Sequence, residues 1–78
     1  MDTEGTIRTV LRELEIDTSG VDGGTRLRED LQVDSTELVE IAVALERRAP
    51  VALDTDEILA LRTFADLVTY VDNAPRRA

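Results

Sequence analysis

The sequence predicts an all-α fold with four helices, and three observations support that prediction. Apolar residues recur at helical spacing in several segments, whereas no stretch alternates apolar and polar residues long enough to suggest a strand. Asp or Thr residues that can cap a helix precede the later segments. The chain of 78 residues contains one Phe, one Tyr and no Trp, so its core is expected to be aliphatic. We expect a single small domain over residues 1–78, with a long first loop and a short third helix.

The first helix is predicted from Thr3 to about Glu15. Its apolar residues recur at helical spacing: Ile7, Val10, Leu11 and Leu14. The run DTSGVDGG then brings three glycines and begins a long loop. Apolar residues later in that loop are expected to anchor it to the core: Leu27, Leu31 and Val33.

The second helix is predicted to begin at Asp34 or Ser35. Asp34 can cap the free backbone amides, and Glu37 completes a variant of the capping box. One face is apolar and should turn toward the core: Leu38, Ile41, Ala42 and Leu45. Pro50 ends the helix shortly after two arginines that suit its negative C-terminal end.

The third helix is predicted in the segment DTDEILAL, capped by Asp54 or Thr55. Thr63 is expected to cap the fourth helix. The residues of this last helix that should turn inward are Phe64, Leu67, Val68 and Val71.

The chain is acidic, with 9 basic and 17 acidic residues and a net charge of −8. Nucleic acid and anionic membranes are poor partners for such a surface, because both bind basic patches. The charge is also uneven, since residues 29 to 46 contain no Lys or Arg and these acids: Glu29, Asp30, Asp34, Glu37, Glu40 and Glu46. A basic protein partner is therefore expected. The acidic N-terminus does not resemble a signal peptide and the longest apolar run is IAVAL, so the cytoplasm is expected.

Catalysis by the chain alone is not expected. There is no His and no Cys, and Ser35 has no His or Lys to take its proton. A calcium loop beginning at Asp17 also fails, because Val21, Asp22 and Arg28 occupy its fifth, sixth and twelfth positions. We therefore predict no enzyme activity and no metal site.

Two interpretations of Ser35 are consistent with the residues alone. The serine could simply belong to a helix cap with Asp34, which is the common situation for such a pair. Alternatively, it could accept a group from another protein, because the N-terminus of a helix favours a phosphate ester.

The surrounding sequence favours modification. Residues 25 to 46, TRLREDLQVDSTELVEIAVALE, resemble the carrier-site region of acyl carrier proteins. The residues that carry the likeness are Thr25, Leu27, Asp30, Leu31, Asp34, Ser35, Val39, Glu40, Ile41, Leu45 and Glu46. The segment LDTDEILALRTFADLVTYV resembles the third and fourth helices of that family, so the likeness covers nearly the whole chain.

This resemblance implies a four-helix bundle of the acyl-carrier type that holds acyl groups as thioesters on 4′-phosphopantetheine. The group would come from coenzyme A and be attached to Ser35 by a phosphopantetheinyl transferase. Asp34 would help the transferase to recognise this site. Further partners implied are an acyl-loading ligase or acyltransferase and a ketosynthase or condensation enzyme. The carrier itself is expected to be a monomer.

Partner contacts are expected on the second helix, where Thr36, Glu40, Val43 and Arg47 share a face turned away from the core. The full set expected to contact partners is Thr36, Glu37, Val39, Glu40, Val43, Glu46 and Arg47. Val43 could also be an isolated surface hydrophobic residue, and the acids could form only a solvated face. The acyl chain is expected to shelter between the second and third helices, lined by Leu45, Ile58 and Leu61.

The chain also departs from the fatty-acid carriers it resembles. Thr36 replaces the usual Leu after the serine, and Arg47 and Arg48 follow Glu46 where acids and an aromatic residue are common. These departures favour a discrete carrier for polyketide, lipopeptide or another specialised acyl-chain pathway. Two alternatives remain: a carrier of aminoacyl or aryl groups in nonribosomal peptide assembly, and an unmodified acidic helical adaptor.

Overall fold

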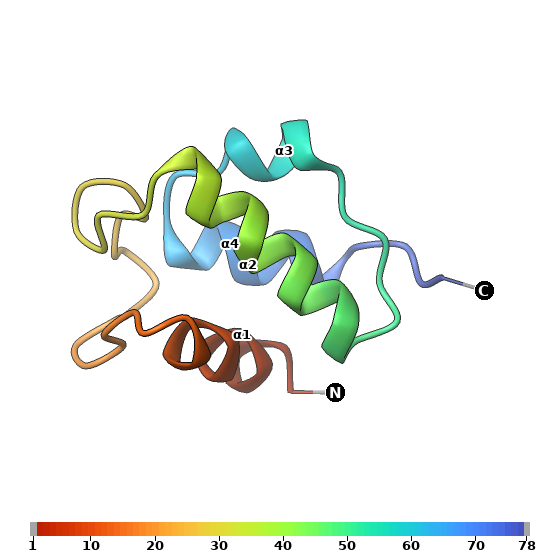
Figure 1. Cartoon of the computed structure of the whole chain (residues 1–78), viewed down its shortest axis with the longest axis horizontal. Helices are drawn as coiled ribbons and strands as arrows, with labels where there is room; N and C mark the ends of the chain where they lie inside the picture. Colours follow the sequence, from red (N-terminus) through yellow and green to blue (C-terminus); the bar gives the residue numbers. More distant parts are fainter. Residues whose placement is uncertain (1, 78) are drawn as a thin grey trace.

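The computed structural model describes residues 2–77, and in this range it contains four α-helices and no sheet. They are α1 (Thr3–Glu13), α2 (Ser35–Arg48), α3 (Thr55–Leu59) and α4 (Phe64–Asp72). Figure 1 shows α1 and the short α3 on opposite sides of α2, with α4 behind it. Contacts join α2 to α1 and α3, and α1 to α4. The predicted all-α bundle, with its long first loop and short third helix, is confirmed.

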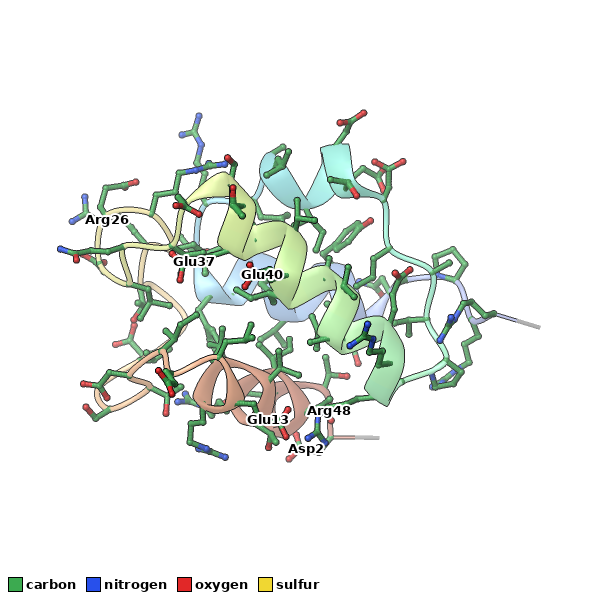
Figure 2. The ribbon with its side chains drawn as sticks, in the orientation of Figure 1. Asp2, Glu13, Arg26, Glu37, Glu40 and Arg48 are labelled. Atoms are coloured by element: carbon green, nitrogen blue, oxygen red, sulfur yellow. The ribbon has the colours of Figure 1, made fainter. Side chains whose placement is uncertain are left out.

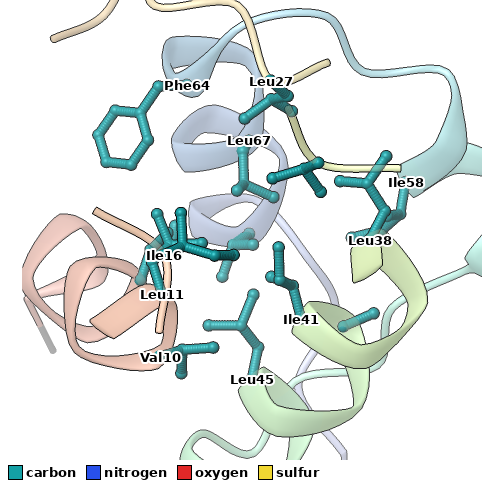
Figure 3. Packing of buried hydrophobic residues seen from close by; sticks show 14 of the residues in the cluster. Val10, Leu11, Ile16, Leu27, Leu38, Ile41, Leu45, Ile58, Phe64 and Leu67 are labelled. Atoms are coloured by element: carbon teal, nitrogen blue, oxygen red, sulfur yellow. The ribbon is translucent and has the colours of Figure 1, made fainter. Parts of the chain in front are cut away.

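The core is aliphatic apart from Phe64, as the composition predicted. Figure 3 shows core side chains from α1, α2, α3 and α4 together with side chains of the long loop. The predicted inward face of α2 is confirmed, because all of its members are buried: Leu38, Ile41, Ala42 and Leu45. Three residues expected to be inside are only partly buried and pack at the edge of the core: Leu14, Leu31 and Val68.

The first helix ends at Glu13, two residues before the predicted end, because the chain turns into a left-handed conformation at Glu15 (φ 63°). The amides of Glu15 and Ile16 donate to the carbonyls of Arg12 (3.0 Å) and Leu11 (2.9 Å). These bonds form the usual closing pattern of a helix, in which glycine is the commonest left-handed residue. Spacing alone did not show that a glutamate would fill this position.

The long loop is fixed to the bundle by Arg8, a role that the sequence did not indicate. The Arg8 guanidinium donates to the carbonyl of Val21 at 2.8 Å and lies 5.0 Å from the centre of the Phe64 ring. Further along the loop, the Leu27 amide donates to the Arg62 carbonyl at 2.9 Å. The loop is therefore held by polar contacts as well as by its apolar residues.

The segment after α4 returns to the end of α2. The Ala52 amide donates to the Pro75 carbonyl at 2.8 Å, and the Arg77 guanidinium donates to the carbonyls of Glu46 and Ala49. The bonds from Arg77 satisfy carbonyls at the C-terminal end of α2. Within residues 2–77, none of the helices has both the length and the apolar character needed to cross a bilayer.

Candidate modification site and docking face

The N-terminus of α2 is capped by Asp34 and not by Ser35. One carboxylate oxygen of Asp34 accepts a hydrogen bond from the Glu37 amide at 2.8 Å. The Glu37 carboxylate in turn accepts from the Asp34 amide at 3.4 Å, which completes the predicted capping box. Ser35 is thus the first helical residue, and its side chain is not needed for the cap.

Ser35 is exposed, and its polar groups are available. Within residues 2–77, neither its hydroxyl nor the backbone amides of Ser35 and Thr36 make a hydrogen bond to the protein. Unpaired amides at the positive end of a helix dipole favour a phosphate group placed there. The first turn of α2 can therefore accommodate a phosphate ester on this hydroxyl.

The segment before α2 places the serine at the surface. Gln32 has a left-handed backbone (φ 57°), and next to it Val33 is 2% exposed. The Val33 amide donates to the Leu27 carbonyl at 3.0 Å. Because Val33 is fixed in the core, Asp34 and Ser35 come next at a fixed position on the edge of the bundle. The backbone at Gln32 is less favourable for a residue with a side chain, a cost that often accompanies functional segments.

Most acids of residues 29 to 46 take part in local contacts. Asp30 accepts from the Arg26 guanidinium at 3.0 Å and from its amide at 2.8 Å, and these hydrogen bonds lower the pKa of the Asp30 carboxyl. Glu29 lies 3.8 Å from the same guanidinium. Glu46 accepts from the Leu53 amide at 3.0 Å. Together with the two capping acids, five of the six acids are therefore engaged within the fold.

Glu40 differs from these acids, because its carboxylate has no hydrogen-bond or ion-pair partner within residues 2–77. Figure 2 shows Glu40 on the face of α2 that is turned away from the core. Arg47 is likewise exposed and makes no such contact in the described chain. Fewer acids without a partner are therefore available to a docking protein than the sequence suggested.

A shallow groove runs along this face between α2 and α1, with a volume of about 290 Å³. Its lining residues are Leu14, Val39, Glu40, Val43, Ala44 and Arg47. Val43 is 42% exposed and is the one large hydrophobic residue that is clearly exposed in the described chain. The structure therefore brings together four of the predicted docking residues, Val39, Glu40, Val43 and Arg47. Leu14 and Ala44 also line the groove. The sequence did not indicate Leu14, because the periodicity of α2 does not show which residues at the end of α1 lie beside it.

The other predicted docking residues lie elsewhere. Thr36 is exposed in the first turn of α2, close to Ser35. Glu37 belongs to the cap, and Glu46 bonds the loop that comes after α2. Neither Glu37 nor Glu46 lines the groove.

The three residues expected to line an acyl pocket do not meet around one cavity. Leu45 and Ile58 are 1% and 0% exposed, and in Figure 3 they occupy different parts of the core. Leu61 is partly buried and lines a separate hollow of about 380 Å³ that also contains Arg26, Arg28 and Arg62. An acyl chain between α2 and α3 would require these two helices to move apart.

Comparison with known proteins gives matches that cover most of the chain. A family profile described as "Phosphopantetheine attachment site" matches residues 6–71. An acyl carrier protein of Helicobacter hepaticus is 33% identical over 73 residues, which cover 92% of this chain and 96% of the relative. An acyl carrier protein of Acidothermus cellulolyticus is 41% identical over 59 residues, covering 76% and 70% of the two chains. One of Campylobacter jejuni subsp. jejuni serotype O:23/36 is 34% identical over 64 residues, covering 82% and 83%.

Proposed function

Because the chain belongs to the acyl carrier protein family, we propose that Ser35 is the residue that bears its prosthetic group. Proteins of this family are carriers and not enzymes, and their prosthetic group is 4′-phosphopantetheine. When attached, this group supplies the thiol that holds acyl groups as thioesters. In this proposal residues 1–78 form one carrier domain.

The observation that carries the proposal is the division of roles at the start of α2. Asp34 and Glu37 satisfy the cap, which leaves the Ser35 hydroxyl exposed and without a partner in residues 2–77. The free amides of the first turn suit the phosphate that would join the arm to the serine. The chain offers no histidine or lysine to activate the hydroxyl, so the transferase would have to supply the base.

Asp34 has a second role in this proposal, as a residue that the phosphopantetheinyl transferase recognises. The cap uses one carboxylate oxygen of Asp34, and the side chain is exposed beside Ser35. A basic group of the transferase could contact the other oxygen without breaking the cap. The same carboxylate would then fix the helix start and mark the site.

We further propose that the cargo belongs to a specialised pathway, such as polyketide or lipopeptide assembly. The support is the polar, exposed Thr36 beside the serine and the arginine pair at the end of α2. The partners would then be a loading ligase or acyltransferase and a ketosynthase or condensation enzyme. A carrier of aminoacyl or aryl groups remains the alternative, and the loading enzyme distinguishes the two.

The groove face of α2, formed by Val39, Glu40, Val43 and Arg47, is the proposed docking surface for these enzymes. The exposed Thr36 would extend this surface toward Ser35, whereas Glu37 and Glu46 would act mainly by holding the helix and the next loop in place. Ser35 lies at the N-terminal end of this face, so an enzyme docked there reaches the arm. Leu45, Ile58 and Leu61 remain the proposed acyl lining, in a state with α2 and α3 apart.

The test is the mass of the intact protein after incubation with coenzyme A, Mg²⁺ and a broad-specificity phosphopantetheinyl transferase. The chain contains a second serine, Ser19, which is also exposed and comes two residues after an aspartate. We expect the native chain and Ser19→Ala to gain one phosphopantetheine and Ser35→Ala to gain none. Modification of folded Ser35→Ala, or none of the native chain while a control carrier reacts, would refute the assignment.

A further inference from the structure

The groove face of α2 carries charges of opposite sign at its two ends. Glu40 and Arg47 are exposed and have no ion-pair partner within residues 2–77. They are separated by two helical turns, or about 10 Å along the axis. Both line the same groove, so one bound surface can meet both charges.

Along α2, the apolar residues Val43 and Ala44 lie between these charges, and Val39 and Leu14 also line the groove. Val43 is the most exposed large hydrophobic residue of the groove. An exposed apolar centre with polar groups around it is the usual arrangement of a protein contact site. The order from the Ser35 end is therefore acid, apolar centre, base.

The neighbouring Arg48 shows that this pattern does not simply reflect the basic end of the helix. Arg48 forms an ion pair with Glu13 of α1, and Figure 2 shows the two side chains together where the helices meet. The charge of Arg48 is thus paired with an acid of the same chain at the surface, whereas Arg47 has no ion-pair partner within residues 2–77. Of these two adjacent arginines, Arg48 joins α2 to α1 and Arg47 can contact a partner.

On the basis of the proposed carrier function, we infer that this groove selects a partner surface with a basic, an apolar and an acidic side chain in that order. The basic group faces Glu40, the apolar group enters at Val43, and the acidic group faces Arg47. A uniformly basic surface would match the net charge of −8 but would place a positive group against Arg47. The ordered charges also fix the direction of docking, so that the partner's active site lies toward Ser35.

A pair of synthetic helical peptides of identical composition tests this inference. The first carries Arg, Leu and Glu on one face, with Arg and Glu seven residues apart. The second has the Glu moved to the opposite face, so both have the same net charge and the bulk attraction to an acidic protein is equal. Binding is measured by NMR titration of the unmodified chain, with the Val43 methyl groups as the reporter.

We expect the first peptide to bind about threefold more tightly, the size of effect typical of one exposed ion pair. This preference should disappear in Arg47→Gln and persist in Arg48→Gln, which removes the same charge one residue away. Equal binding by the native chain, loss of the preference in Arg48→Gln, or shifts centred away from Val43 would overturn the inference.

A second copy of this chain could also occupy the groove. In an antiparallel arrangement of two copies, Glu40 of one would face Arg47 of the other. Sedimentation without peptide is expected to show a monomer, and a dimer lost in Arg47→Gln would overturn the choice of a different protein as partner. Attachment of phosphopantetheine to Ser35 is measured independently by mass, so its failure would refute the proposed function and not the binding pattern.

Discussion

The N-termini of α2 and α4 use the same capping device in opposite surroundings. In α4, the Thr63 hydroxyl accepts from the Asp66 amide at 3.1 Å, and the Asp66 carboxylate accepts from the Thr63 amide at 3.2 Å. In α2, Asp34 and Glu37 exchange the equivalent pair of bonds. Both helices are thus stabilised locally by a capping box.

The two helices differ in the residues immediately after the cap. The first residue of α4 is Phe64, which is 2% exposed, and its amide donates to the Thr25 carbonyl at 2.8 Å. The next amide, that of Ala65, donates to the Gly23 carbonyl at 3.0 Å. The corresponding residues of α2 are exposed and their amides are free of such bonds within residues 2–77. A helix N-terminus can serve as an attachment site when its first residue is exposed and its first amides have no hydrogen-bond acceptor in the fold. The start of α2 meets this condition, and the start of α4 does not.

The largest expected contrast comes from replacing the first residue of each helix by alanine. Phe64→Ala should lower the free energy of unfolding by about 3–5 kcal/mol, because it leaves a cavity in the core. Ser35→Ala should change it by less than about 0.5 kcal/mol, because the side chain is exposed and unbonded. Urea unfolding monitored by circular dichroism measures both, and similar losses in the two variants would show that Ser35 is part of the fold.

A smaller effect is expected from removing the caps themselves. Asp34→Ala and Thr63→Ala should each cost about 1 kcal/mol of unfolding free energy. Asp34→Asn should keep most of this stability, since an amide oxygen can still accept from Glu37, while the charge next to Ser35 is lost.

This last variant separates the two proposed roles of Asp34. We expect the rate of phosphopantetheine transfer to Asp34→Asn to fall although the helix remains intact by circular dichroism. An unchanged rate would leave Asp34 with the capping role alone.

Acid should weaken the α4 cap. Hydrogen bonds from the amides of Thr63 and Arg62 lower the pKa of the Asp66 carboxyl below its usual value of 3.8. Its folded pKa is below its unfolded pKa, so the stabilisation is complete above about pH 3.8 and is lost as the pH falls through the folded value. Urea midpoints measured between about pH 5 and pH 2 should fall less steeply for Asp66→Asn than for the native chain.

The smallest effect expected is that of salt on the unmodified protein. With a net charge of −8, added salt should raise the melting temperature by screening self-repulsion. Glu40→Gln should reduce this dependence, because Glu40 has no compensating partner within residues 2–77. A melting temperature that salt leaves unchanged or lowers would contradict the argument from charge.

Features set by neighbouring residues were predictable from the sequence. The start of α2, its buried face and the Thr63 cap depend on side chains three or four positions apart, and all were found as predicted. Features that depend on distant residues were not. The bond from Arg8 to Val21, the engagement of Glu46 with Leu53 and the contribution of Leu14 to the groove all require the folded arrangement.

The candidate site shows the same limit. The pattern around Ser35 identified the residue to consider, but the sequence could not distinguish acids that hold the fold from acids that face solvent. The six acids of residues 29 to 46 look alike in the sequence, and only Glu40 lacks a partner in the described chain. The closed packing of Leu45 and Ile58 was equally hidden, because helical periodicity identifies inward residues without showing whether space remains between them.

The contacts of Arg8 have a consequence for how the long loop opens. One guanidinium joins α1, the loop carbonyl of Val21 and the ring of Phe64. The first half of the loop can therefore leave the bundle only if this side chain also gives up its place between α1 and α4. The protected amides in this half of the loop should therefore exchange with deuterium in the same cooperative unit as α1 and α4. Although the loop has no regular secondary structure, its protected amides should exchange as slowly as those of the core.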